Sequence, residues 1–295
     1  MLRENNMTKK QTIQKYFNQK EKLKLSNPTY KKQVKFLTDW FLAEDLGDRG
    51  DITSDLIIKH NSPTTAIVMA KENGIIAGLE EITWILTKYK IHITKYKKDG
   101  DSIKKGQQIL QIKGKIKDIL KLERTILNIL QRMSGIATQT NKIVKFTHNK
   151  VLICPTRKTQ WGLLDKKAVT LGGGSTHRLG LHDWILIKDN HIKFINYSLF
   201  LTPYSFFEIE CKTEQQVWEF LGLKPGAIML DNMKPEQIKK LVPQIKTINP
   251  NLILEASGGI NETNISKYAK TGVDIISIGA LTHSIKSLDI SLDIC

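Results

Sequence analysis

The sequence has few cysteines, few arginines and no long uncharged hydrophobic run. Its three cysteines, Cys154, Cys211 and Cys295, are too scattered for a disulfide framework or for zinc-ligand spacing. No apolar stretch approaches the ~18 residues that a bilayer span requires. The first 25 residues are polar and lysine-rich, without the apolar region of a secretory signal. The sequence therefore predicts a protein of a reducing compartment, most simply the cytoplasm, without a membrane span.

Two common nucleotide-binding motifs are also missing. No GxGxxG follows the first strand-like run, and no GxxxxGK[ST] occurs anywhere in the chain. These glycine-rich turns hold the phosphates in Rossmann and P-loop proteins. Their absence favours another α/β architecture for the parallel strands expected below.

Positive charge is in excess, and it is carried mostly by lysine. The chain has 45 Lys and Arg against 29 acids, a net charge of +16, but only six of the 45 are arginine. Such a balance favours nucleic acid, a membrane surface, or a phosphorylated or carboxylated small molecule as a partner. Four arginines fall between Arg124 and Arg178, and the planar guanidinium binds carboxylate or phosphate with two parallel hydrogen bonds. This region is where we expect an anion site.

The pattern of elements changes along the chain. Residues 1–26 read as a mobile basic arm or a fraying helix. Residues 29–115 read as a small α+β layer that begins with an amphipathic helix over 29–44. A long or broken helix over 116–148 follows, interrupted at Ser134 and Gly135. Beyond it, short apolar runs alternate with helix-like stretches, which predicts parallel β/α units and, without a Rossmann motif, a barrel.

Polar residues follow these apolar runs repeatedly. In a β/α barrel the chemistry lies at the carboxyl ends of the strands. Adjacent cations repel each other unless an anionic ligand compensates them, so the cations expected at one mouth predict a site for a multiply charged anion. The four permanent cations are Arg157, Lys158, Arg178 and Lys188, and His177 is a titratable donor among them.

Two carboxylates and two glycine-containing turns complete the expected site. Glu210 and Asp231 come from separate strands and suit Mg²⁺ or sugar hydroxyls, although internal salt bridges to the lysines are an equal alternative for either residue alone. The segments SGGI (257–260) and SIGA (277–280) follow the last two strand-like runs, where phosphate sites commonly form.

Seven segments, in this order, resemble the quinolinate phosphoribosyltransferase family, also called nicotinate-nucleotide pyrophosphorylase (carboxylating). The likeness covers roughly residues 30–295. The segments are AEDLGDRGDITS (43–54), ERTILNILQRMSGIAT (123–138), TRKT (156–159), GGGSTHRLGLHDWILIKDNHI (172–192), EIEC (208–211), LDNMKPEQI (230–238) and EASGGINETNI (255–265).

The resemblance implies an α/β fold with an amino-terminal open α/β sandwich over 27–135 and an incomplete α/β barrel over 136–295, with the carboxyl-terminal tail able to pack back on the sandwich. It implies conversion of quinolinate and phosphoribosyl pyrophosphate (PRPP) to nicotinate mononucleotide, pyrophosphate and CO₂ in NAD biosynthesis, with Mg²⁺ as cofactor. It also implies a homodimer with shared active sites, or a higher oligomer, and no nucleic-acid partner.

The resemblance also assigns roles to the matching residues. Arg124 reaches the pocket of a partner subunit, while Arg157, His177 and Arg178 hold the two quinolinate carboxylates. The candidate catalytic residues are Lys158, Lys188, Glu210 and Asp231. Among these, Lys158 and Lys188 contact substrate charge or phosphate, and Glu210 and Asp231 contact the ribose hydroxyls or Mg²⁺, directly or indirectly. Ser257, Gly258 and Gly279 bind the 5′-phosphate.

Three other interpretations remain. A paralogous phosphoribosyltransferase of the same fold, acting on another aromatic acid, shares most of these features. An RNA-binding protein fits the charge of +16, but the sequence lacks interleaved basic and aromatic residues of the usual kind. An inactive homologue would be expected to have lost part of the Arg, Lys, Glu and Asp set, which is intact here.

Overall fold

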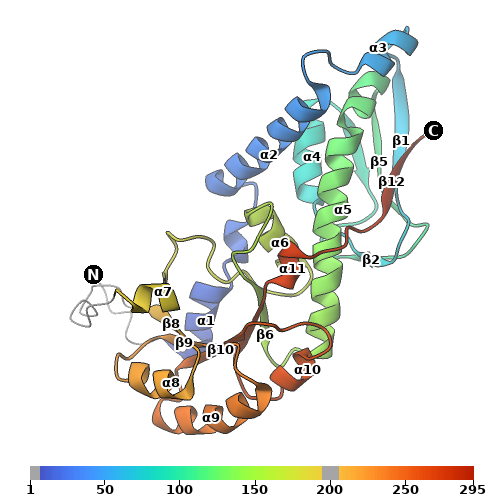
Figure 1. Ribbon diagram of the computed structural model, residues 1–295. Helices are drawn as coiled ribbons and strands as arrows, with labels where there is room; N and C mark the ends of the chain where they lie inside the picture. The colour runs from blue at the N-terminus through green and yellow to red at the C-terminus, as the bar shows by residue number, and fades with distance from the viewer. Residues whose placement is uncertain (1–6, 195–205) are drawn as a thin grey trace. The chain divides into compact units, whose positions relative to one another are not determined.

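The computed structural model describes residues 7–194 and 206–295, and the chain forms two compact units (Figure 1). The barrel unit comprises residues 1–19, 142–158 and 174–283, and the sandwich unit comprises residues 20–141, 159–173 and 284–295. The units are therefore interleaved along the chain, whereas the sequence predicts consecutive domains that meet after residue 135. The difference arises because one helix runs through that point and because two later segments return to the sandwich unit.

Parallel strands form the centre of the barrel unit. The six strands are hydrogen-bonded in the order β6-β11-β10-β9-β8-β7, so that β6 and β7 are the two edges of an incomplete barrel. The strands are β6 (Leu152–Pro155), β7 (Ile185–Ile187), β8 (Phe207–Cys211), β9 (Ala227–Asp231), β10 (Ile253–Ser257) and β11 (Ile275–Ile278).

Helix α1 (Lys9–Phe17) of the barrel unit precedes these strands in the chain. The helices that follow strands of the barrel are α7 (Asp189–Ile192), α8 (Glu214–Leu221), α9 (Pro235–Ile248), α10 (Ile265–Tyr268) and α11 (Ala280–His283). In α9, Pro235 occupies the first turn, where its missing N–H costs nothing, and Ile238, Leu241 and Ile245 recur at helical spacing on the buried face. β10 is buried along its whole length, which is typical of a parallel strand covered on both faces.

The sandwich unit has an antiparallel sheet in the order β12-β1-β5-β3 and a two-stranded sheet, β2-β4. The carboxyl-terminal strand β12 pairs with β1, so the tail completes the sheet that the amino-terminal half begins. The elements are η1 (Lys20–Lys22), α2 (Pro28–Leu46), α3 (Ile52–Ile57), β1 (Pro63–Ala70), β2 (Gly74–Ile75), α4 (Leu79–Lys88), β3 (His92–Lys95), β4 (Ser102–Ile103), β5 (Gln108–Lys115), α6 (Leu163–Leu171) and β12 (Ile290–Ile294).

Helix α5 (Ile116–Phe146) is continuous through Ser134 and Gly135, where the sequence allows a break. The Ser134 hydroxyl accepts a hydrogen bond from Ala77 N at 3.0 Å, and a Cβ on Gly135 would lie 2.2 Å from the Lys286 carbonyl oxygen. Both small residues therefore permit close packing inside the sandwich unit and do not end the helix. Within residues 7–194 and 206–295, no helix combines the length and the apolar character needed to cross a bilayer.

The structure places a packed helix, α1, within the segment expected to be a mobile basic arm or a fraying helix over residues 1–26. Thr8 caps α1 by accepting from Gln11 N, and Phe17 at the end of the helix is fully buried. Phe17 joins a core cluster of the barrel unit with Trp184, Phe206 and other apolar side chains. Residues 7–19 are thus part of the barrel unit, because their apolar side chains enter its core, whereas residues 20–26 belong to the sandwich unit.

Candidate active site

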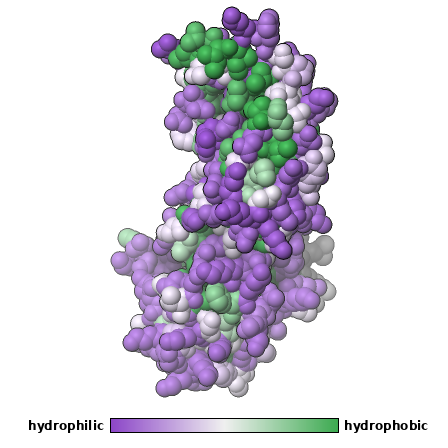
Figure 2. Space-filling view, turned by 90° about the vertical axis from the view of Figure 1, so that its right-hand side faces the viewer, coloured by the Kyte–Doolittle hydropathy of each residue, from purple (hydrophilic) through white to green (hydrophobic). Residues whose placement is uncertain are grey.

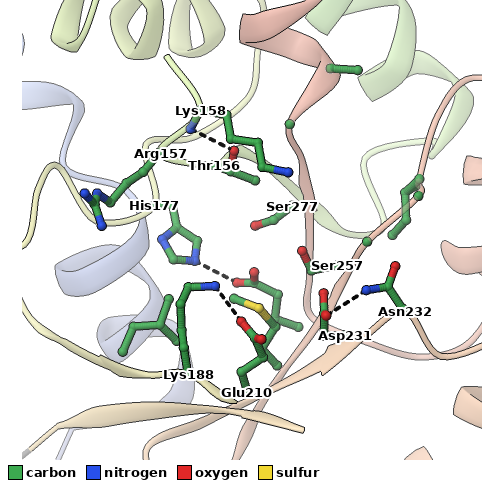
Figure 3. Close-up of a pocket in the computed structure, with 18 of the residues that line it drawn as sticks. Thr156, Arg157, Lys158, His177, Lys188, Glu210, Asp231, Asn232, Ser257 and Ser277 are labelled. Atoms are coloured by element: carbon green, nitrogen blue, oxygen red, sulfur yellow. Dashed lines mark hydrogen bonds and ion pairs between the residues drawn. The ribbon is translucent and has the colours of Figure 1, made fainter. Parts of the chain in front are cut away.

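A cavity of about 720 Å³ opens where the barrel strands end (Figure 3). The strand register brings three polar side chains level with one another, because Ser257 on β10 pairs with Asp231 on β9 and with Ser277 on β11. The predicted residues that line the cavity are Arg157, Lys158, His177, Arg178, Lys188, Glu210, Asp231, Ser257, Gly258 and Gly279. The polar ends predicted from the sequence therefore form one site.

His177 is held in an unusual backbone conformation, with φ at +51°, which non-glycine residues rarely adopt. Its ring Nδ1 accepts a hydrogen bond from the Arg178 backbone N–H at 2.8 Å. In the neutral imidazole the proton is therefore on Nε2, which donates to a Glu255 carboxylate oxygen at 3.0 Å. The ring is thus fixed from both sides at the cavity wall.

Two glutamates lie beneath His177, and both are fully buried. Glu208 Oε2 is 3.6 Å from His177 Nε2, and the three residues place possible ligand atoms within 4.8 Å of one another. Burial, reinforced by the negative charge of Glu255, raises the pKa of Glu208 well above its ordinary value. The protonated form of Glu208 is therefore favoured, which reduces the repulsion between the two neighbouring carboxyl groups.

The cations of the cavity lie close together. Arg178 is buried, and its pKa is lowered first by that burial and next by the positive charge of Arg157. Such crowding is unfavourable in an empty site and is relieved when an anion binds between the guanidinium groups. The geometry is therefore that of a receptor for a negatively charged ligand.

Lys188 and Glu210 form an ion pair across the neighbouring strands β7 and β8. Figure 3 shows both side chains on the cavity side of the sheet. Asp231, at the end of β9, accepts a hydrogen bond from the Asn232 amide at 2.7 Å. Glu210 and Asp231 thus place carboxylate oxygens, the ligand type that Mg²⁺ prefers, along one side of the cavity.

The turns after β6, β10 and β11 bring backbone close to the cavity. Gly258 has φ of +90°, and a Cβ there would lie 2.4 Å from the Asn232 side-chain oxygen. A Cβ on Gly279 would lie 3.1 Å from the His283 ring and 3.4 Å from Lys158 Cδ. The Thr282 hydroxyl donates to the Lys158 carbonyl at 2.9 Å, which fixes the turn that carries Lys158. Backbone N–H groups in such tight turns can approach phosphate oxygens.

Arg124 is the predicted site residue that does not join this cavity among the described residues. It lies on α5 in the sandwich unit, its side chain is 57% exposed, and its guanidinium is 4.0 Å from a Glu123 carboxylate oxygen.

Sequence reasoning missed several residues of the site. The main omission is the pairing of Glu208 with Glu255 next to His177. The sequence marks Glu208 as a polar residue that alternates with Glu210 along its strand, without a role, and Glu255 stands inside an apolar run. A charged residue in the middle of an otherwise buried strand is the signal that could have found them. Asn232, Ser277 and His283 also line the cavity.

Two family models match consecutive segments of the chain. Residues 51–134 match the N-terminal domain of quinolinate phosphoribosyl transferase, and residues 136–293 match its C-terminal domain.

Individual relatives match over most of their length. A probable nicotinate-nucleotide pyrophosphorylase (carboxylating) of Methanocaldococcus jannaschii is 42% identical over 83% of this chain and 92% of its own. A Bacillus subtilis protein of the same description is 40% identical over 89% and 93%. The solved nicotinate-nucleotide pyrophosphorylase of Francisella tularensis is 36% identical, with a TM-score of 0.81 over 90% of this chain and 96% of that one. This chain belongs to the quinolinate phosphoribosyltransferase family.

Proposed function

We propose that the protein transfers the phosphoribosyl group of PRPP to quinolinate, with loss of one carboxylate, giving nicotinate mononucleotide, pyrophosphate and CO₂. The observation that carries this proposal is the crowding of His177, Arg178, Arg157, Lys158 and Lys188 on one cavity. Both substrates are strongly anionic, one as a dicarboxylate and one as a polyphosphate. Family membership makes them the natural ligands of this site.

The two substrates use different parts of the cavity in this proposal. Arg157, His177 and Arg178 hold the two carboxylates of quinolinate, since a guanidinium can match a carboxylate with two parallel hydrogen bonds. The turns at Ser257, Gly258 and Gly279 hold the 5′-phosphate of PRPP. The pyridine ring then lies beside the anomeric carbon of the ribose.

Positioning and electrostatics supply the catalysis. The ring nitrogen donates its electron pair to the anomeric carbon while the bond to pyrophosphate breaks, and pyrophosphate leaves with that bonding pair. Positive charge grows on the sugar, which Glu210 and Asp231 stabilise, and negative charge grows on the leaving group, which Lys158 and Lys188 stabilise. No protein nucleophile takes part.

Decarboxylation follows from the charge on the ring. Once the nitrogen is quaternary, the C–C bond to the carboxylate at the neighbouring carbon breaks, CO₂ leaves, and the electron pair stays on that carbon. The adjacent positive nitrogen stabilises this pair until a proton from water replaces the carboxylate. His177, held by Glu255, keeps the carboxylates aligned during both steps.

Mg²⁺ is the cofactor in this proposal. Glu210 and Asp231 supply hard carboxylate oxygens, and Mg²⁺ typically combines one or two such ligands with substrate phosphates and water. When bound, the ion supplies positive charge that offsets the pyrophosphate. Lys188 pairs with Glu210, so it holds that carboxylate in place and contributes charge to the same region.

We further propose a homodimer in which Arg124 completes the partner's site. The sandwich unit exposes large apolar side chains on α2 and α3, including Phe36 at 68%, Trp40 at 55% and Leu56 at 79%. Figure 2 shows apolar surface gathered at the top of the view, where α3 lies in Figure 1. Exposed apolar groups of this size are typical of an interface between subunits.

The cytoplasm is the proposed compartment. Among the described residues, Cys154, Cys211 and Cys295 form no disulfide, which suits a reducing environment.

Product identification by mass spectrometry tests the proposed reaction. The purified protein is incubated with quinolinate, PRPP and Mg²⁺, and each component is omitted in turn. Nicotinate mononucleotide in the complete mixture alone supports the proposal. Conversion of nicotinate or another aromatic acid, with quinolinate inert, would instead support a paralogous phosphoribosyltransferase of the same fold.

A further inference from the structure

The end of α1 forms hydrogen bonds with the segment that carries His177. The Phe17 carbonyl accepts from the backbone N–H groups of Thr176 and His177, both at 3.0 Å, and from the Ser175 hydroxyl at 2.7 Å. The last carbonyls of a helix have no partner within the helix, so here the barrel supplies one. One backbone oxygen thus binds three consecutive residues beside the cavity.

Two further links surround that oxygen. Gln19 N donates to the Thr176 hydroxyl at 2.9 Å, and the Thr176 hydroxyl lies 3.1 Å from the Phe17 carbonyl oxygen. The Gln19 side-chain amide also donates to Asp183, which accepts from Leu179 N at 2.9 Å. The loop from Thr176 to Asp183 is therefore connected to the amino-terminal segment at both of its ends.

The rings of Phe17 and His177 are also in contact. Their centroids are 5.2 Å apart and their planes are nearly perpendicular, at 89°. An edge-to-face contact of this kind favours one orientation of the imidazole. Phe17 therefore acts on His177 through both its carbonyl and its side chain.

His177 needs such support because its backbone is strained. A φ of +51° is unfavourable for a residue with a Cβ and persists only where the surroundings enforce it. The His177 N–H is buried, and without the Phe17 carbonyl it would lose its hydrogen bond. The strained backbone is what directs the ring toward Glu255 and the cavity.

We propose that the amino-terminal segment from α1 to Gln19 is a positioning element of the active site, with Phe17 holding His177 in the conformation that binds a carboxylate of the pyridine substrate. This inference rests on the proposed function for the identity of that substrate. Phe17 is a positioning residue, because it does not line the cavity itself. The segment read from the sequence as a basic arm thus acquires a role in substrate binding.

The test compares Phe17→Ala with Phe206→Ala in the full-length protein. Phe206 is the matched control because it belongs to the same core cluster and contacts Phe17, with ring centroids 6.1 Å apart. Amide hydrogen exchange at residues 175–178, melting temperature, and KM for quinolinate and for PRPP are measured for both. Phe17→Ala keeps the backbone carbonyl but removes the ring that packs on His177 and holds the end of α1 in the core. It should speed exchange at His177 and raise KM for quinolinate about two- to tenfold, as expected from losing an edge-to-face contact.

Phe206→Ala should lower the melting temperature without either change. Equal effects of the two substitutions on exchange at His177 and on KM for quinolinate would overturn the proposal. So would unchanged exchange at His177 in Phe17→Ala.

A second pair of variants decides the question if Phe17→Ala does not fold. Thr176→Val removes the hydroxyl that links Gln19 to Phe17 while keeping the side-chain shape, and Thr176→Ser keeps the hydroxyl. Faster exchange at His177 in Thr176→Val, reversed in Thr176→Ser, supports the proposal, and identical exchange in both contradicts it. Hydrogen exchange requires no turnover, so a wild-type protein that makes no nicotinate mononucleotide would refute the proposed function without deciding this inference.

Discussion

His177 and Glu255 form a buried pair in which ring Nε2 lies 3.0 Å from a carboxylate oxygen. The Arg178 backbone N–H donates a hydrogen bond to the other ring nitrogen, Nδ1, so the neutral imidazole has one possible tautomer here, with its proton on Nε2. Glu255 therefore orients the ring as well as supplying negative charge. These two roles can be separated by substitution.

Glu255→Leu removes the acceptor, and Glu255→Gln keeps an oxygen that can accept from Nε2. We expect Glu255→Leu to lower kcat/KM for quinolinate by about ten- to a hundredfold, the usual cost of losing a hydrogen bond to a charged group. Glu255→Gln should lose less, about five- to tenfold, because a neutral hydrogen bond replaces the charged one. Steady-state kinetics give both values, and equal losses in the two variants would show that the charge, not the acceptor, matters.

Glu208 makes stability depend on pH. Because its pKa is raised above the ordinary value of 4.5, the folded protein keeps a proton that the unfolded chain releases as pH rises past that value. Folding stability should therefore fall between pH 4.5 and the raised pKa of Glu208.

Glu208→Gln removes this dependence. It should raise the melting temperature at pH 8 more than at pH 5, as measured by thermal denaturation across that range. Glu236→Gln, at an exposed position of α9, is the control. A Glu208→Gln curve parallel to that of the wild type would show that Glu208 is not protonated in the folded state.

Arg157→Lys tests the assignment of the carboxylates. Lysine keeps the positive charge but lacks the planar guanidinium that makes two parallel hydrogen bonds to a carboxylate. KM for quinolinate should therefore rise about tenfold, while KM for PRPP changes less. Arg49→Lys, at an exposed position of the sandwich unit, is the control. Equal increases in both KM values would show that Arg157 does not bind quinolinate specifically.

Two inactive variants test the shared site. Arg124→Ala and Lys158→Ala should each abolish most of the activity alone, and mixed dimers should regain part of it, because one of the two sites then contains both wild-type residues. Activity is measured after co-expression with two different tags and purification of the hybrid. Hybrids of verified composition that stay inactive would place Arg124 and Lys158 in the same subunit's site.

The carboxyl ends of the strands could be predicted from the sequence, because a short apolar run followed by polar residues is typical of the point where a parallel strand ends. The turns after β6 and β7 and the carboxyl end of β9 illustrate this, with Arg157, Lys188 and Asp231 in the places expected. Family resemblance added the order of the segments and the division into two parts.

Buried charges and long-range contacts could not be predicted in the same way. Glu208 and Glu255 are recognisable as a pair only when β8 and β10 are placed in one barrel. Phe17 contacts Thr176 across 159 residues of sequence, and no local pattern indicates such a contact. The continuity of α5 depends on what packs against Gly135, which local helix propensity does not include.

The most direct test of the proposed reaction follows the carboxylate of quinolinate that is next to the ring nitrogen. Quinolinate labelled with ¹³C at that carboxylate is incubated with the protein, PRPP and Mg²⁺. The labelled products are identified by ¹³C NMR, and the amount of pyrophosphate released is measured in the same samples. We predict labelled CO₂ or bicarbonate in equal amount to pyrophosphate, and unlabelled nicotinate mononucleotide. Pyrophosphate release with the label retained in the nucleotide product, or no reaction with quinolinate at all, would contradict the account.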